Sequence, residues 1–211
     1  MVYARQRLAD RYAQAIVELD ELSFSEQDEQ KRELFDFLLR QCWLALDMCK
    51  NEYNPDTVNM DWDKDNMIND RHPGSLSGGL GEIALMMNPR FDMYGIPAPV
   101  LDKHRQVKLG LDFITGEKSH QVKSGIVSLT GGAIEVTLDL FNTTADYVHI
   151  LTRWEGAAIW YGASTLLWKL LLANEAARYA GEKQPKRFTL DREDMLRFGV
   201  VELLTYDWAT L

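Results

Sequence analysis

Three polar side chains between Gly110 and Lys123 have the types and the spacing to hold a metal ion beside a phosphate. Asp112 is followed, after an eight-residue spacer, by Gln121-Val122-Lys123. Carboxylate and amide oxygens are ligands that hard cations accept at about 2.0–2.6 Å, and an ammonium group attracts phosphate. These residue types therefore indicate chemistry on a phosphate ester, provided that the fold brings them together.

Two strands joined by a turn would position these side chains. Apolar residues alternate over residues 104–114 and 119–127, which is typical of strands, and the turn signal Thr-Gly-Glu-Lys separates them at 115–118. If the turn closes a hairpin, Asp112 lies directly opposite Gln121, with Cβ atoms about 4.5–5.5 Å apart. One cation can then contact oxygen atoms of both side chains.

The alternation along a strand separates a polar face from an apolar face. Gln121 and Lys123 share a face with Asp112, whereas Val122 points the other way into a core. In the same register Lys123 faces Gly110, which has no side chain to fill the space beside it. We therefore expect a solvent-open seat for a metal ion and a phosphate on the polar face.

Asp112 with Gln121-Val122-Lys123 resembles the signature of the PD-(D/E)XK nuclease superfamily, in its Asp…Gln-x-Lys variant. The superfamily includes many type II restriction endonucleases and several repair and recombination nucleases. In such enzymes a glutamate on a preceding helix often joins the site, and segment 78–85 (GGLGEIAL) resembles that helix, with Glu82 in the matching place. The likeness covers residues 74–150.

The chain departs from the family pattern at two positions. Leu111 stands where a proline usually precedes the first aspartate, and Gln121 replaces the usual second acid. A neutral ligand is expected to bind a cation less tightly in the absence of substrate, because magnesium sites commonly use one or two carboxylates plus phosphate oxygens. Glu82 is the residue that could restore the missing charge.

The resemblance implies a restriction-endonuclease-like α/β fold, in which a mixed central sheet is flanked by helices. It implies a magnesium-dependent DNA endonuclease, with Mn²⁺ as a substitute, whose catalytic residues are Glu82, Asp112, Gln121 and Lys123. The implied metal ligands are Asp112, Gln121, Glu82 and the backbone carbonyl of Val122. Cutting both strands of double-stranded DNA takes two such sites, so a homodimer is expected.

Two other functions remain open from the residues alone. The chain could be a non-catalytic DNA- or protein-binding module on a degenerate nuclease fold, with Gln121 as the mark of a lost metal site. It could also be an acidic helical interaction protein in which the motif is a coincidence. The sequence contains no glycine-rich phosphate loop, no Ser-His-Asp ordering and no zinc-ligand spacing that would indicate another class of enzyme.

The length and composition of the chain indicate the class of protein and its location in the cell. The 211 residues are enough for one well-buried domain, or for one domain with a helical appendage. A content of 46% apolar and 26% charged residues is typical of a globular protein. No apolar run approaches the roughly 18–20 residues of a membrane span, and the start of the chain lacks the apolar core of a secretory signal. We therefore expect a cytoplasmic protein that does not contact membranes.

The net charge of −9 is unevenly distributed along the chain. Residues 17–65 hold fourteen acidic and five basic residues, so this segment alone accounts for the whole excess. Residues 101–123 hold five basic against three acidic residues, and residues 178–197 hold six against four. Modest basic surfaces from these two segments permit contact with phosphates.

The segment before the motif is expected to form a separate helical unit, residues 1–73. Apolar residues at helical spacing predict a helix over 3–22 and a second one from Ser25 to about residue 53, followed by an acidic loop. The two helices are expected to form a hairpin that packs against the core, or alternatively against a second subunit. Cys42 and Cys49 lie too far apart on one helix for a disulfide and are expected to be reduced core residues.

Residues 74–211 are expected to form the nuclease-like core with C-terminal helices. Pro73 and Ser75 open the helix that carries Glu82, unless Gly78 and Gly79 only mark a turn before a helix that begins near Leu80. Strand and helix are equally favoured for residues 133–141. A buried strand is predicted over 145–154, and helices over 163–180 and from a cap at Thr189 or Asp191 through 204. Trp154, Trp160, Tyr161 and Trp168 are expected in the core. His120 points to the face opposite Gln121 and is expected to be packed or capping rather than a ligand.

Overall fold

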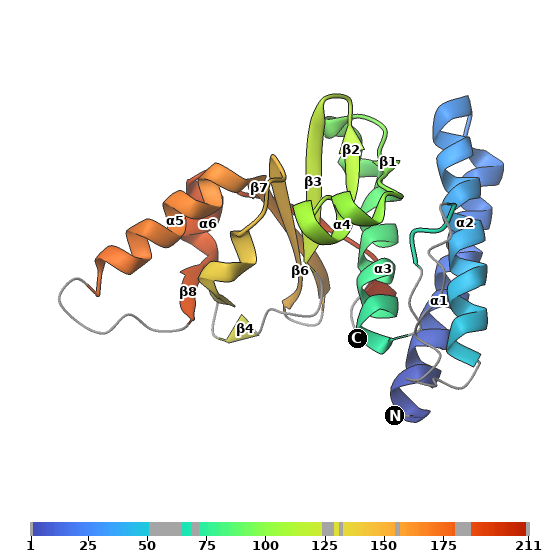
Figure 1. The fold of residues 1–211 in the computed structure, drawn as a ribbon, viewed down its shortest axis with the longest axis horizontal. Helices are drawn as coiled ribbons and strands as arrows, with labels where there is room; N and C mark the ends of the chain where they lie inside the picture. The colour runs from blue at the N-terminus through green and yellow to red at the C-terminus, as the bar shows by residue number, and fades with distance from the viewer. Residues whose placement is uncertain are drawn as a thin grey trace.

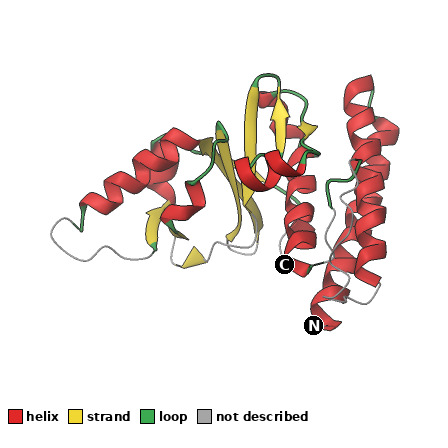
Figure 2. Cartoon of the chain, viewed as in Figure 1, coloured by secondary structure: helices red, strands yellow, loops and turns green. Residues whose placement is uncertain are grey.

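The computed structural model of the chain describes residues 2–50, 65–68, 72–123, 129–130, 133–154, 157–179 and 187–209. Helices flank a central sheet on both sides (Figures 1 and 2). The helices are α1 (Val2–Ser25), α2 (Glu29–Lys50), α3 (Pro73–Met86), α4 (Lys103–Leu109), α5 (Thr165–Ala177) and α6 (Arg192–Arg197), and the short 3₁₀ helices are η2 (Pro89–Tyr94), η3 (Leu138–Phe141) and η4 (Asp207–Ala209). The strands are β1 (Ala98–Pro99), β2 (Phe113–Thr115), β3 (Lys118–Lys123), β4 (Leu129–Thr130), β5 (Ala133–Val136), β6 (Tyr147–Trp154), β7 (Ala157–Ser164), β8 (Phe188–Asp191) and β9 (Val201–Leu204).

The central sheet is mixed and has the order β1-β2-β3-β6-β7-β9. Strands β3 and β6 run parallel, and the other neighbouring strands in this sheet are antiparallel. A smaller antiparallel sheet has the order β4-β5-β8. This arrangement confirms the predicted α/β class with a mixed central sheet flanked by helices.

Two hydrophobic cores cover the two faces of the central sheet. One core joins α1, α2 and α3 to one face, and the other joins α5, β5 and β8 to the opposite face. Figure 1 shows this order from right to left: the α1–α2 pair, α3, the sheet, then α5 and α6. The predicted packing of the N-terminal hairpin against the core is confirmed, and Cys42 and Cys49 are buried and free. Among the described helices, none is long and apolar enough to cross a membrane.

Helix α3 includes both glycines that could have marked a turn. It begins at Pro73, and its N-terminus is capped by His72, whose Nδ1 accepts a hydrogen bond from the Gly74 N–H at 3.1 Å. A Cβ atom at Gly79 would lie 2.5 Å from Cδ1 of Ile68, whereas one at Gly78 would meet nothing within 4 Å. Gly79 is therefore required for close packing, and Gly78 is not.

We expect alanine at these two adjacent positions to have opposite effects on stability. Gly79→Ala should lower the free energy of unfolding by about 1–3 kcal/mol, because the new methyl group overpacks against Ile68. Gly78→Ala should raise it by up to about 1 kcal/mol, the difference in helix propensity between the two residues. Urea denaturation of both variants measures this, and equal stabilisation by both would show that α3 does not approach Ile68 closely.

The hairpin register predicted from the sequence is correct, but the extent of its first strand is wrong. Phe113 pairs with His120 and Ile114 with Ser119, as expected. Residues 103–109, however, form helix α4, which ends at Gly110 in the left-handed conformation with φ of 65°. The first strand of the hairpin is therefore β2 alone. The second strand is β3, and residues 124–127 of the predicted strand lie outside the described part of the chain.

Other element boundaries also differ from the prediction. Ser25 ends α1 with its hydroxyl bonded to the Glu21 carbonyl, and Asp28 instead accepts a hydrogen bond from Lys31 N at the start of α2. The last residues of the predicted second helix, 51–53, and most of the expected acidic loop, residues 54–64 and 69–71, lie outside the described residues. Residues 133–141 contain both a strand, β5, and a short helix, η3.

The predicted C-terminal helix is much shorter than expected, and strands take the place of its end. Asp191 caps α6 as predicted, accepting a hydrogen bond from Glu193 N at 2.8 Å, but the helix ends at Arg197. Gly199, with φ of 98°, turns the chain into β9 at the edge of the sheet. Strand β7 was not predicted, although three of the expected core aromatics are fully buried: Trp160, Tyr161 and Trp168. The side chain of Trp154 lies outside the described part.

Candidate functional site

Asp112 is held by backbone hydrogen bonds to the strands on either side of it. Its N–H donates to the His120 carbonyl at 2.9 Å, and its own carbonyl accepts from Val100 N at 2.9 Å. The Val122 N–H donates to Oδ2 of the carboxylate at 2.6 Å. One carboxylate oxygen is therefore fixed on the backbone of β3, which orients the other oxygen of the same group.

Gln121 is buried, with 7% of its surface exposed, and it packs against Gly110. A Cβ atom at Gly110 would lie 2.3 Å from Nε2 of Gln121 and 2.9 Å from Oγ1 of Thr143. The sequence predicts that Lys123 faces an open gap at Gly110. This detail is wrong, because α4 rather than a strand leads into Gly110, and the Gln121 amide fills that space.

Glu82, Asp112 and Lys123 come from three separate elements, and their charges interact. Burial raises the pKa of the Asp112 carboxyl to about 6, although the Val122 N–H and the Lys123 ammonium both favour its charged form. Burial raises the pKa of Glu82 well above its ordinary value, the Asp112 charge raises it further, and Lys123 lowers it. Lys123 is partly buried and makes no direct ion pair with either carboxylate in the described structure.

These groups resemble the donor set of a magnesium site in kind and in charge. Burial raises the pKa of both carboxyl groups, and the Asp112 charge raises that of Glu82 further; a bound cation would favour the charged form of both. Within the described residues, no three Asp, Glu, His or Cys side chains gather to hold a metal ion. A cation here would therefore need Glu82 and Asp112 together with neutral oxygens, as magnesium commonly does with water and phosphate.

A buried histidine pair lies on the other face of β3. Nδ1 of His120 lies 2.9 Å from Nε2 of His149, and Oγ1 of Thr115 lies 2.7 Å from Nε2 of His120. Burial lowers the pKa of His120 to about 4 and that of His149 well below its ordinary value, so both rings are neutral near pH 7. The pair links β2, β3 and β6 behind the candidate site. The prediction that His120 is a packed residue is confirmed, while the partner His149 has no sequence signal of its own.

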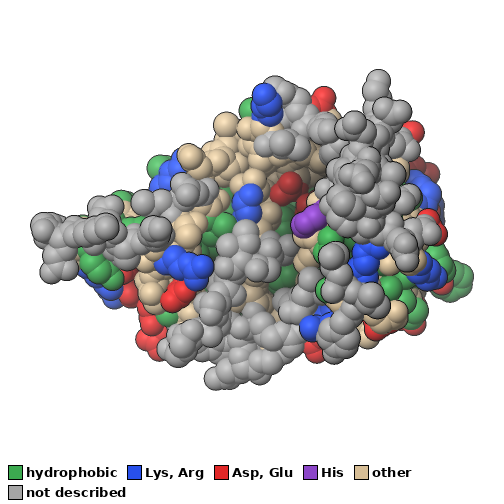
Figure 3. Space-filling view, turned by 60° about the horizontal axis from the view of Figure 1, so that its bottom comes forward, with side chains coloured by type: hydrophobic (Ala, Val, Ile, Leu, Met, Phe, Trp, Pro, Cys, Tyr) green, Lys and Arg blue, Asp and Glu red, His purple; other side chains and the backbone are tan. Residues whose placement is uncertain are grey.

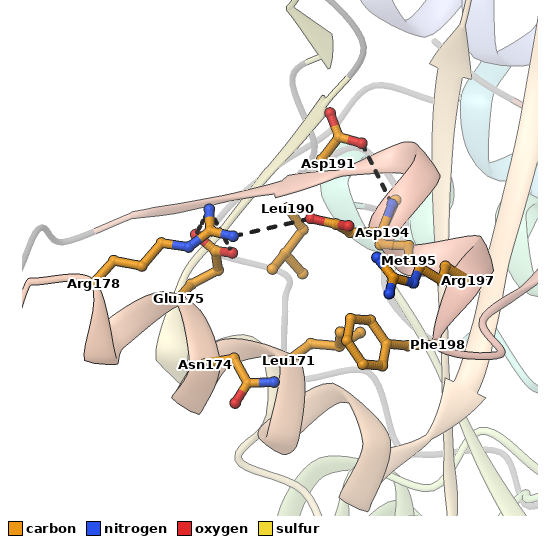
Figure 4. A pocket seen from close by; sticks show the side chains of 10 residues that line it. All are labelled: Leu171, Asn174, Glu175, Arg178, Leu190, Asp191, Asp194, Met195, Arg197 and Phe198. Carbon is orange, nitrogen blue, oxygen red and sulfur yellow. Dashed lines mark hydrogen bonds and ion pairs between the residues drawn. The ribbon is translucent and has the colours of Figure 1, made fainter.

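A separate crevice between α5, β8 and α6 does not include any of the predicted site residues. Its volume is about 260 Å³, and Figure 4 shows its apolar floor with ionised groups at the rim. Arg178 lies 3.1 Å from Glu175 and 4.0 Å from Asp194, so acids of the same crevice neutralise it. We interpret this crevice as a gap between packed helices rather than as the chemical site.

The molecule is hollowed near the centre of the face turned forward in Figure 3, where acidic and basic side chains are both in view.

Comparison with known proteins provides no relative from which to assign a function. No protein family, no curated protein and no solved structure matches the chain. A function must therefore be argued from the geometry of the residues themselves.

Proposed function

We propose that this protein is a magnesium-dependent phosphodiesterase that cuts DNA, built on a PD-(D/E)XK nuclease-like core. The observation that carries the proposal is the electrostatic interaction of Glu82, Asp112 and Lys123. Residues from a helix and from either side of a hairpin, grouped by the sequence pattern alone, share one charged environment. Such clusters of perturbed carboxylates occur preferentially at functional sites.

Each residue has a role that follows from its chemistry. The free oxygen of Asp112, the Glu82 carboxylate, the Gln121 amide and the Val122 carbonyl would hold the cation. When bound, magnesium lowers the pKa of a coordinated water and screens the charge of the phosphate. The role of Gln121 requires its amide oxygen to face the cation while its nitrogen packs against Gly110.

Lys123 is the residue that would act on the reacting groups directly. Its ammonium group carries three hydrogen-bond donors and no acceptor. It would orient the attacking water or stabilise the additional negative charge of the pentacovalent transition state. Its position next to two carboxylates, without a direct ion pair to either, supports this role because the ammonium group is then available to a substrate.

Glu82→Gln should raise the magnesium concentration that gives half of the maximal cleavage rate by about 10–100-fold, which is the effect commonly seen when a group that supports a metal site is removed. The physical reason is the loss of one of two carboxylates from a site whose other donors are neutral. A magnesium titration of the cleavage rate measures this. An unchanged titration curve would remove Glu82 from the site.

The proposed activity is tested by incubating the protein with unmethylated plasmid or phage DNA, with Mg²⁺, with Mn²⁺ and with EDTA. Metal-dependent cleavage supports the proposal, and discrete fragments would indicate a restriction enzyme whereas a smear would indicate a nonspecific nuclease. Duplex cleavage by one site per chain calls for a homodimer. Analytical ultracentrifugation with and without duplex DNA tests that state.

A second candidate is a non-catalytic module on the same fold that binds DNA or protein. The observation that favours it is the neutral Gln121 in place of an acid, packed against Gly110. The same incubation separates the two candidates when binding is measured alongside by gel shift. DNA binding in the gel shift with no cleavage in Mg²⁺ or Mn²⁺ would support the non-catalytic binding module. Cleavage would exclude it.

A further inference from the structure

Helix α4 carries two exposed cations immediately before the candidate site. Arg105 and Lys108 are both exposed, and neither forms an ion pair with another residue of the described chain. They are three residues apart, so they lie on one side of the helix with Cβ atoms about 5–6 Å apart. This helix therefore presents a small surface of uncompensated positive charge.

The position of α4 is fixed by hydrogen bonds at both of its ends. Asp102 caps its start by accepting from Arg105 N at 2.8 Å, and the Gln106 side chain bonds to the Val100 carbonyl. At its other end the Leu109 carbonyl accepts from the Thr144 hydroxyl at 2.9 Å. A helix of only seven residues is marginal alone, so these contacts determine where its cations lie.

The same contacts place Lys108 close to the candidate site. Lys108 is two residues before Gly110, a distance of at most about 7.6 Å along the chain, and Gly110 packs directly against the Gln121 side chain. Asp112 follows two residues later, bonded to β3. The C-terminal end of α4 is therefore close to Gln121, and Lys108 is the exposed cation nearest to that end.

Acidic groups near the hairpin do not cancel this charge. Glu117 and Asp146 lie at the other end of β3, where Asp146 accepts hydrogen bonds from the Ser119 N–H and hydroxyl at 2.9 Å. That end is about 16 Å from Lys123, given a rise of about 3.3 Å per residue. Asp102, which caps the helix, keeps its charge but is a single acid against Arg105 and Lys108, so the helix with its cap stays net positive. The two site carboxylates repel a phosphate diester, so flanking cations would be needed to hold one there.

We propose that Arg105 and Lys108 bind phosphate groups of the nucleic acid strand on either side of the bond to be cut. Helix α4 would then position the backbone of the substrate. This inference rests on the proposed function and names the surface through which the substrate is held. Backbone contacts of this kind fix the position of a protein on DNA without reading the sequence. They release condensed counterions and so set the salt dependence of binding.

The test compares Arg105→Gln/Lys108→Gln with a control of equal charge change, Lys169→Gln/Arg197→Gln. Lys169 and Arg197 are exposed on α5 and α6, outside the candidate site. Binding of a fluorescein-labelled duplex is measured by anisotropy in EDTA at several salt concentrations. The first variant should bind more weakly, and the slope of log K against log salt should become shallower by about 1.8, which corresponds to two phosphate contacts. The control should match the wild type.

Two other results would separate this inference from the proposed function. If the wild type cuts DNA and the α4 variant keeps the wild-type slope and affinity, α4 does not seat the backbone and the inference is wrong, while the nuclease proposal stands. If the wild type neither binds nor cuts DNA with Mg²⁺ or Mn²⁺, the proposed function is wrong and the inference falls with it. Thermal melting of both variants confirms that these exposed substitutions leave the fold unchanged.

Discussion

Replacing Lys123 with alanine is expected to reduce DNA cleavage by at least about 10²–10³-fold, the loss seen when one group that stabilises transition-state charge is removed. DNA affinity should change little, because the backbone of the substrate is held by other cations. The measurement is the single-turnover cleavage rate at saturating protein, together with the dissociation constant from anisotropy. Retained cleavage would remove Lys123 from the chemical step.

Lys118→Ala is the matched control for this substitution. Lys118 and Lys123 are the first and last residues of β3, and Lys118 is exposed beside the turn. It lies near Asp146 rather than near the site carboxylates. Its removal should leave the cleavage rate within about twofold of the wild type, because surface cations far from the reacting bond contribute mainly to weak, salt-dependent binding. An equal loss in both variants would indicate a general effect of charge rather than a catalytic role.

Replacing Asp112 with asparagine is expected to abolish cleavage and, at the same time, to stabilise the fold at pH 7–8. A pKa of about 6 in place of 3.8 means that the folded state holds this proton more tightly than the unfolded state does. At about 1.36 kcal/mol per pH unit, the ionised carboxylate then costs up to about 3 kcal/mol of stability above pH 6. Asparagine can still accept the Val122 N–H bond and carries no charge.

The raised pKa of Asp112 determines how the stability difference between the wild type and Asp112→Asn changes with pH. The contribution of Asp112 to stability is fully present below pH 3.8, where the group is protonated in both states, and is lost as the pH rises through about 6. The stability gain of Asp112→Asn should therefore vanish near pH 3.5 and reach its maximum above pH 7. Urea denaturation across this range measures it, and a variant that is less stable at every pH would contradict the raised pKa.

Asp146→Asn provides a control with the opposite sign. Hydrogen bonds from the Ser119 N–H and hydroxyl lower the pKa of the Asp146 carboxyl. Its ionised form therefore stabilises the folded state above the ordinary pKa, and this contribution is lost as the pH falls. Asp146→Asn should destabilise the protein at pH 7–8 and leave the cleavage rate unchanged. The two aspartates thus separate a functional carboxylate from a structural one.

The hairpin register could be predicted from the sequence because the relevant signals are local. The turn at Gly116 and the alternation along β3 fix which residues face each other, so the pairing of Phe113 with His120 follows without tertiary information. The helix of Glu82 was also predictable, because Pro73 marks its first turn. The packing of α3 on β3, which places Glu82 near Asp112 and Lys123, is a tertiary contact that these local signals do not determine.

Helix α4 could not be predicted from the same patterns. Its apolar residues alternate with charged ones as in a strand, and seven residues provide too little helical propensity to decide the matter. The cap at Asp102 and the left-handed Gly110 are helix signals, but the hydrogen bonds from Thr143 and Thr144 to its last turn join residues more than thirty positions apart. Such contacts exist only in the folded protein, and they explain why Gln121, not Lys123, faces Gly110.

Strand β9 was missed for a related physical reason. Residues 201–204 continue the apolar spacing of the preceding helix, so the spacing alone extends that helix across Gly199. In the structure Gly199 adopts a positive φ, and the edge of β7 provides backbone partners, such as Trp160 for Leu203. The free sheet edge, which the sequence does not reveal, determines that this segment is extended.

The central claim is that Asp112 is part of a site that holds a divalent cation on a DNA phosphate. Its most direct test is Mn²⁺ binding, followed by electron paramagnetic resonance, to the Lys123→Ala protein in complex with a short duplex. We predict that this complex binds a single Mn²⁺ ion per chain, displaced by Mg²⁺, and that adding Asp112→Asn weakens this binding at least about tenfold. Equal Mn²⁺ binding by the two proteins, or none by either, would contradict the account.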